Sequence, residues 1–280
     1  MTNRDLNHHG YFKLLAIYGG LSVALILTLI PFLWMLSTSL KPDDAITALP
    51  PQWIPRELTL EHYRQLFAAM SFVRAFGNSL LVSLGATLLG LLINGLAGYA
   101  FAKFRFPGRE RLFALLLATM MVPGQVTMMP VFMLLKELGL LNSFAGLIVP
   151  MSASVFAIFL IKQFMETIPD ELLEAARIDG CSELGILFRI VLPMSKPVLA
   201  TVALFTFMAA WNEFLWALIV MLDEARYTLP VALANLNGQH GTAWGLLMAG
   251  SVVVIVPVVA VFLAMQKYYV RGIATSGLKG

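Results

Sequence analysis

Long uninterrupted apolar runs dominate the pattern of hydrophobic and polar positions along this chain. Five runs contain no charged residue, and a sixth is interrupted only by Glu213. A helix needs roughly 20 residues to cross the hydrocarbon core of a bilayer, whereas the strands of a membrane barrel alternate with a period of two. The pattern therefore predicts an all-α membrane protein with six transmembrane helices in one domain over residues 1–280. The predicted spans are residues 14–36, 79–102, 112–135, 143–161, 198–222 and 243–266.

The distribution of basic residues predicts how these spans are oriented. The first run is too long for the core of a cleaved signal sequence, so we expect it to remain as a helix. With six spans both termini share one side, and that side receives 13 of the 19 Lys and Arg residues. Basic residues are enriched in cytoplasmic loops, so both termini are expected in the cytoplasm.

Composition removes several classes of function. Of the 280 residues, 59% are hydrophobic and 12% are charged, against roughly 25% charged in a typical soluble domain. This argues against a soluble enzyme, and a net charge of +3 is too small and too scattered for a nucleic-acid groove. The single cysteine, Cys181, excludes a disulfide framework, and His8 and His9 lack a second pair of ligands, so no metal site is expected.

The predicted cytoplasmic segment 162–197, hereafter the coupling loop, is long enough to fold by itself. Thr167 and Asp170 have the spacing of a capping box, with Pro169 in the first helical turn. The helix that follows is expected to stop at Gly180, because glycine is best suited to a left-handed C-terminal cap.

A second short helix is expected to begin at Ser182 and to end before Pro193. Both helices are too apolar for a free solvated connection, so this surface docks against something. It packs either on the helix ends of its own chain or on another protein, and the pattern alone leaves both interpretations open. The apolar residues are Leu172, Leu173, Ala176, Ile178, Leu187, Phe188, Ile190, Val191 and Leu192.

Three short motifs in the coupling loop carry a family resemblance. Glu174–Ala176, then Asp179–Gly180, then Ile190–Pro193 resemble the EAA motif of permease subunits of bacterial ABC importers, with matching spacing throughout. Ser39–Pro42 and Trp211–Glu213 are similar to the carbohydrate-uptake (maltose-type) branch, whose permeases share a MetI-like core. One departure is Cys181, where the family usually has alanine. The residues that match the motif are Glu174, Ala175, Ala176, Asp179, Gly180, Ile190, Leu192 and Pro193.

The resemblance implies that the coupling loop seats in a cleft of a cytoplasmic ATPase, with Glu174 paired to a basic residue there. It implies a non-catalytic permease subunit in a bacterial inner membrane, which works by alternating access. The implied partners are a second, related permease, two ATPase subunits, an external solute-binding protein and a sugar or sugar-like solute. The chain contains no GxxxxGK[ST] phosphate loop. We therefore expect no cofactor on this chain, with ATP and Mg on the partner ATPase.

Polar residues within the spans are candidates for the translocation path. A carboxylate such as Glu213, beside Asn212, costs roughly 2.5–3.5 kcal/mol at the centre of a membrane helix, so it should face a cavity or a partner. Gln125 lies between two prolines that should bend the third span. Asn94 belongs to a stripe of small residues on the second span, where close helix packing is the default and a path role the alternative. For Glu213 and Gln125, packing also remains open.

The polar external loop before the last span contains Asn237, Gly238 and Gln239. By resemblance, the matching loop of maltose-type permeases reaches into the solute-binding protein. The alternative function is a secondary transporter driven by an ion gradient. Such a transporter needs ionisable groups in several spans, whereas Glu213 is the one such group in these spans, so the importer is favoured.

Overall fold

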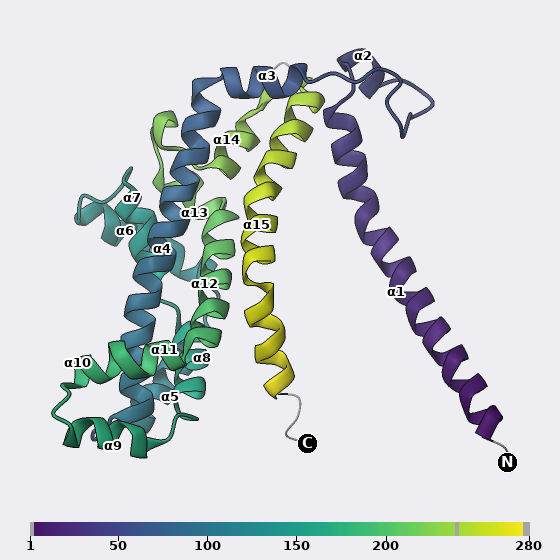
Figure 1. Cartoon of the computed structure of the whole chain (residues 1–280). Helices are drawn as coiled ribbons and strands as arrows, with labels where there is room; N and C mark the ends of the chain where they lie inside the picture. Colours follow the sequence, from purple (N-terminus) through teal and green to yellow (C-terminus); the bar gives the residue numbers. More distant parts are fainter. Residues whose placement is uncertain (1–2, 239–240, 277–280) are drawn as a thin grey trace. The chain divides into compact units, whose positions relative to one another are not determined.

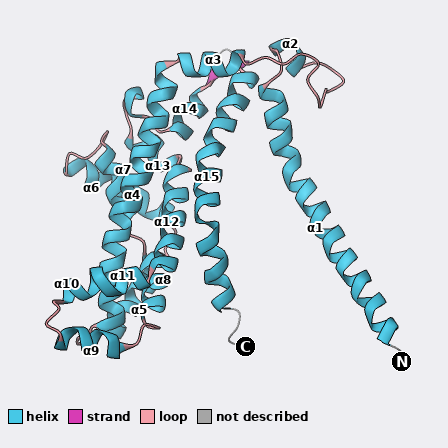
Figure 2. Cartoon of the chain, in the orientation of Figure 1, coloured by secondary structure: helices cyan, strands magenta, loops and turns pink. Residues whose placement is uncertain are grey.

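The computed structural model describes residues 3–238 and 241–276 of the chain (Figure 1). These residues are almost entirely helical, with one antiparallel pair of two-residue strands (Figure 2), which confirms the all-α fold class. The chain forms two compact units: Met1–Ala69 with Leu236–Val253, and Met70–Asn235 with Val254–Gly280. The long last helix, α15 (Trp244–Ser276), contributes to both.

The first unit contains a long apolar helix and a set of short elements. Helix α1 (Asn3–Ser39) carries the first predicted span, and none of its most apolar window is buried. A helix that is apolar on all sides needs cover from lipid or from another subunit. The other elements of this unit are α2 (Asp43–Ile46), α3 (Glu61–Ala68), β1 (Asn237–Gly238), β2 (Gly241–Thr242) and the first turns of α15.

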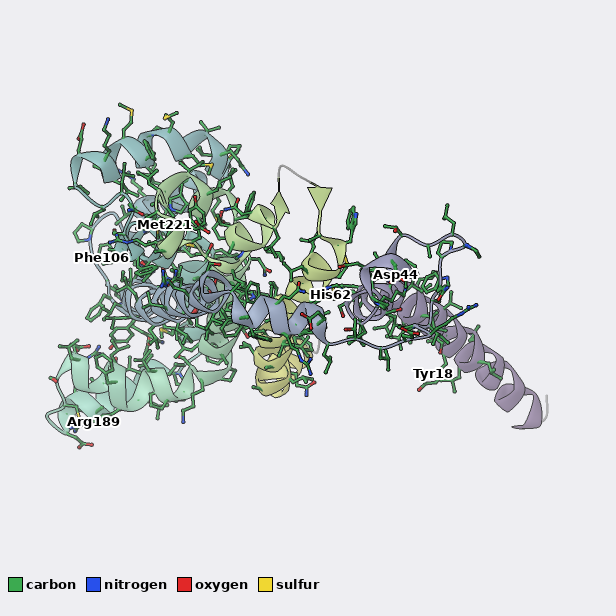
Figure 3. All side chains as sticks on the ribbon, turned by 90° about the horizontal axis from the view of Figure 1, so that it is seen from above. Tyr18, Asp44, His62, Phe106, Arg189 and Met221 are labelled. Carbon is green, nitrogen blue, oxygen red and sulfur yellow. The ribbon has the colours of Figure 1, made fainter. Side chains whose placement is uncertain are left out.

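A buried histidine links the short elements of this unit. His62 on α3, labelled in Figure 3, has a ring nitrogen 2.8 Å from the carbonyl oxygen of Lys41. The start of α15 approaches the same ring so closely that a Cβ at Gly245 would overlap it. Only glycine therefore fits at this position without a shift of the histidine.

The second unit is built around α4 (Met70–Lys103), which packs mainly against α12 (Lys196–Trp211), α8 (Val155–Met165) and α7 (Phe144–Ser152) (Figure 1). The close approach predicted for the small-residue stripe is confirmed. A Cβ at Gly98 would lie 2.5 Å from Cγ2 of Ile161, and one at Gly90 would lie 3.0 Å from the carbonyl oxygen of Ser152. The remaining elements are α5 (Arg109–Thr119), α6 (Gly124–Glu137), α9 (Asp170–Ile178), α10 (Glu183–Ile186), the π-helical η1 (Leu187–Val191), α11 (Leu192–Met194), α13 (Leu215–Val220), the 3-10 turn η2 (Glu224–Arg226) and α14 (Leu229–Asn235).

Three helices among the described residues are long and apolar enough to cross a membrane, namely α1, α4 and α15. Three further pairs of segments qualify only when each bent pair counts as one span, which gives up to six crossings by length and composition. The bends are 100° between α5 and α6, 42° between α7 and α8, and 81° between the α10–α11 segment and α12.

Three of the predicted spans, 112–135, 143–161 and 198–222, are not continuous helices, because each contains a break between two helices. The first break follows from Pro123, which has an extended conformation before α6 and has no N–H to donate. The second break follows from Ser154, whose hydroxyl caps α8 by accepting the N–H of Ala157. The third separates α12 from α13 at residues 212–214, where Glu213 accepts a backbone N–H of α13.

Candidate functional site

The coupling loop begins with α9, which ends in a left-handed glycine as predicted. Gly180 has a φ of 81°. Its N–H donates to the carbonyl of Arg177, and the N–H of Cys181 donates to that of Ala176, at 3.0 and 2.9 Å. These are the two bonds of a Schellman cap, which satisfies the last carbonyls of a helix. The turn therefore depends on a backbone conformation that glycine adopts at no steric cost.

Two details of the predicted caps are wrong. Thr167 donates its hydroxyl to the carbonyl of Phe164 at the end of the preceding helix, whereas α9 starts directly after Pro169 and has no side-chain cap. The second helix does begin with Ser182, which accepts the N–H of Gly185, but helical structure continues through Pro193 to α11. The hydrogen-bond register changes to that of a π-helix over η1, which places Pro193 in the first turn of α11. Proline is tolerated there, because the N–H groups of a first helical turn have no partner within the helix.

The apolar residues of the coupling loop differ in burial, and packing on the helices of their own chain is observed for the buried ones. One face packs on α4, α8 and α12 in a cluster that includes Ile161 and Met165. The residues of this buried face are Leu173, Ala176, Ile186, Leu187 and Val191. Four other apolar side chains of the coupling loop are exposed, and the most exposed is that of Ile178 at 86%. These residues, hereafter the exposed face, are Leu172, Ile178, Leu184 and Phe188.

Two polar links fix the buried face to α4. The Nζ atom of Lys103, at the end of α4, donates to the carbonyl of Ile168 and to a carboxylate oxygen of Asp170, the latter at 2.6 Å. The Lys103 side chain is 4% exposed. Its hydrogen bond and its charge lower the pKa of the Asp170 carboxyl below its usual value. The lysine thus joins the C-terminal end of α4 to the start of α9.

The second link crosses the turn itself. The Arg177 guanidinium donates to both carboxylate oxygens of Glu183, at 2.6 and 3.3 Å. The hydroxyl of Tyr99 on α4 donates to the same carboxylate at 3.2 Å. One glutamate therefore ties α9, α10 and α4 together.

The motif residues lie around this turn with different environments. Glu174, Ala175, Asp179, Gly180 and Pro193 are exposed, Ala176 is buried, and Ile190 and Leu192 are half-buried. Among the described residues, the carboxylate of Glu174 forms no ion pair or hydrogen bond, and its charge acts on the nearby Arg177. The exposed apolar face is thus accompanied by a carboxylate that can pair with a base on another protein. Arg189, labelled in Figure 3, is also exposed on η1.

A cavity of about 560 Å³ forms where the helix breaks of the second unit meet. Three of the four predicted path residues line it: Gln125 in the first turn of α6, and Asn212 and Glu213 between α12 and α13. A carboxylate oxygen of Glu213 accepts the backbone N–H of Trp216 at 2.8 Å. Irregular backbone at membrane depth is tolerated where protein or a water-filled cavity covers it. The breaks and the cavity therefore fit together.

Asn94 lies apart from this cavity and is fully buried. Its Nδ2 donates to the carbonyl of Ser152 at 2.9 Å, and its Oδ1 accepts the N–H of Ser154 at 3.0 Å. The side chain therefore supplies the two backbone partners that are missing at the break between α7 and α8. This geometry supports the packing interpretation of Asn94.

The predicted external loop is described only in part. Asn237 and Gly238 form β1, where Asn237 pairs with Thr242 and Gly238 with Gly241. Gln239 lies outside the described residues.

Comparison with known proteins identifies the family. Residues 86–275 match the family model described as "Binding-protein-dependent transport system inner membrane component". The chain belongs to this family. Its relatives include an arabinooligosaccharides transport system permease of Halalkalibacterium halodurans, 36% identical over 264 residues that cover 93% of this chain and 95% of that protein. A lactose transport system permease of Rhizobium radiobacter is 34% identical, over 92% and 94% of the two chains.

A solved structure shows the same fold. One chain of a bacterial ABC transporter involved in the import of the acidic polysaccharide alginate matches with a TM-score of 0.82. The match covers 96% of this permease and 99% of that chain at 24% identity, which supports the fold alone. The predicted MetI-like permease fold is confirmed, and the chain is a transport component of a membrane system.

Two functional features of the permease were not predicted from its sequence. Lys103 is one of the 13 basic residues expected on the cytoplasmic side, and Tyr99 lies within the predicted span 79–102. Both lie near the C-terminal end of α4, where a basic or hydroxyl-bearing residue at the end of a predicted span is the available signal. Their partners, Asp170 and Glu183, are 67 and 84 residues away, so the pairing requires the fold.

Proposed function

We propose that this permease is one membrane subunit of an ATP-driven, binding-protein-dependent importer for a sugar or sugar-like solute. The carrying observation is the two-faced coupling loop, which is anchored to the predicted spans on one side and exposes an apolar face with a free carboxylate on the other. The named relatives transport arabinooligosaccharides and lactose, which supports a carbohydrate solute.

The proposed assembly contains a second, related permease, two cytoplasmic ATPase subunits and an external solute-binding protein. ATP and Mg would bind the ATPase, and this chain would contribute no catalytic residue. The assembly lies in a bacterial inner membrane with both termini of this chain in the cytoplasm. Asn237, Gly238 and Gln239 would then face the binding protein on the opposite side.

Coupling would follow from the links within the loop. When ATP closes the ATPase dimer, its surface moves the exposed face formed by Leu172, Ile178, Leu184 and Phe188. The Glu183 carboxylate and the Lys103 ammonium carry that movement to α4, and the buried face carries it to α8 and α12. The cavity at Gln125, Asn212 and Glu213 would switch between inward-facing and outward-facing access. The loaded binding protein shifts this equilibrium only through different affinities for the two states.

Purification of the tagged chain from its native membrane in mild detergent tests the proposal. We expect an ATPase, a second permease and a solute-binding protein to co-purify, and ATP-dependent solute uptake in liposomes. Ile178→Glu should lose the ATPase because it places a charge in the exposed apolar face. Leu49→Glu is the matched control, since Leu49 is 89% exposed outside the coupling loop, and it should retain the ATPase. A chain that purifies alone and moves solute without ATP would overturn the proposal in favour of a secondary transporter.

A further inference from the structure

The side chains that line the cavity between the helix breaks determine which solute charge it accommodates. Among the described residues that line it, Glu213 alone carries an ionisable side chain. The other polar side chains are the amides of Gln125 and Asn212, the hydroxyl of Thr127 and the indole of Trp216, whose N–H has no hydrogen-bond partner among the described residues. The cavity therefore presents one carboxylate and no basic group to a solute.

The carboxylate is held in place but is not neutralised. One oxygen of Glu213 accepts the N–H of Trp216, which fixes the side chain at the start of α13. None of the described basic residues forms an ion pair with it. The second carboxylate oxygen therefore keeps its capacity to accept a hydrogen bond.

The neighbouring amides add complementary hydrogen-bonding groups. Asn212 uses its Nδ2 to donate to the carbonyl of Met208, which leaves its amide oxygen as a further acceptor. Gln125, which is exposed at the cavity, offers both a donor and an acceptor. Phe214, 39% exposed, supplies an apolar wall. A few polar groups on an apolar lining are typical of sites for small molecules, and these acceptors suit the hydroxyl groups of a sugar.

We propose that this cavity is a subsite for an uncharged glycosyl unit and that Glu213 selects against anionic sugars. The inference rests on the proposed importer function and names the class of its solute. A uronate or phosphate in the cavity would approach an unpaired carboxylate with no basic side chain to compensate it. Two unit charges about 8 Å apart at an effective dielectric of about 20 change a dissociation constant roughly 30-fold. The relatives leave this question open, because they include systems named for uncharged lactose and for sulfoquinovosyl glycerol, which carries a sulfonate.

Equilibrium dialysis of the purified complete transporter, without its binding protein, tests the inference. The probes are α-1,4-linked galactotriose and trigalacturonate, which differ at carbon 6 of each ring, a hydroxymethyl group in one and a carboxylate in the other. We expect galactotriose to bind about 10- to 100-fold more tightly. Glu213→Gln keeps a hydrogen-bond acceptor and removes the charge, so it should narrow this ratio to about threefold or less. Glu137→Gln is the matched control, since Glu137 lies on α6 but does not line the cavity, and it should keep the wild-type ratio.

The outcomes separate this inference from the proposed function. Equal binding of the two sugars, binding of neither, or a ratio unchanged by Glu213→Gln would overturn the charge selectivity of the cavity. ATP-dependent uptake by the same preparation, with the solute that co-purifies on its binding protein, reports on the importer function independently. Loss of that uptake in the wild type would count against the importer itself, whatever the dialysis shows.

Discussion

Gly180 offers a sharp test of the coupling loop because the chain contains a second glycine in the same local structure. Gly139 follows the end of α6 with a φ of 68°. Its N–H donates to the carbonyl of Lys136, and the N–H of Leu140 donates to the carbonyl of Leu135. This is the Schellman pattern found at Gly180. A Cβ at either glycine meets no atom within 4 Å, so a substitution strains the backbone without a clash.

The free-energy cost of replacing either glycine follows from its left-handed backbone conformation. A non-glycine residue in the left-handed region costs about 1–2 kcal/mol, which changes the balance between the native turn and a relaxed turn by about 5- to 30-fold. Gly180→Ala and Gly139→Ala should therefore destabilise the chain by similar amounts. Only Gly180→Ala should lower uptake per ATP hydrolysed, because only this turn lies in the coupling loop. Asparagine tolerates the left-handed region, so Gly180→Asn should recover part of the lost uptake.

The assay is ATP-dependent uptake together with ATP hydrolysis in proteoliposomes that contain the complete transporter. Thermal unfolding in detergent and the amount of inserted protein are measured on each variant. Normal coupling in Gly180→Ala would refute the assignment of this turn. An equal loss of coupling in Gly139→Ala would show that strain anywhere in the chain has the same effect.

Three further predictions concern the contacts of α4 and the coupling loop. Because Lys103 lowers the pKa of Asp170, their pair stabilises the protein above the ordinary aspartate pKa of about 4, and this stabilisation is lost as pH falls through the lowered pKa. The stabilities of wild type and Asp170→Asn, from melting curves, should therefore differ at neutral pH and converge in acid. The difference should be less than about 1 kcal/mol, because the carboxylate is exposed. Asn94→Leu leaves two buried backbone groups without partners and should lower the free energy of unfolding by roughly 2 kcal/mol or more. Thermal or denaturant unfolding measures this change, and a decrease below about 0.5 kcal/mol would contradict the role of Asn94 at the helix break. Gly98→Ala would place a Cβ 2.5 Å from a side-chain atom of Ile161 and should lower the melting temperature. Gly95→Ala is the control, since its Cβ would meet its nearest atom at 3.9 Å, and it should leave the melting temperature unchanged. Equal effects of the two substitutions would argue against the tight packing of α4.

Local rules account for what was predictable from the sequence. The apolar runs gave the long helices, and the left-handed turn at Gly180 and the cap at Ser182 follow from single residues and their immediate neighbours. The small-residue stripe on α4 correctly indicated close packing. Each of these depends on interactions over a few positions, or on the general need to cover an apolar face.

The features that were not predicted depend on residues far apart in the chain. The break between α7 and α8 is stabilised by Asn94, about 60 residues earlier, which replaces the missing backbone partners. A side chain that acts as a backbone partner leaves no periodic signal. The cavity likewise requires the breaks at Gln125 and Glu213 to meet, which is a property of the packed helices.

Photo-cross-linking from the exposed face of the coupling loop tests the central claim most directly. Cys181→Ala removes the only cysteine, and Leu184→Cys in that background then carries a photoactivatable label on the exposed apolar face. In native membranes, the account predicts a cross-link to an ATPase subunit, whereas a label at Leu49→Cys should give none. Cross-links from position 184 to lipid or to this chain alone, in membranes that support ATP-dependent uptake, would contradict the account.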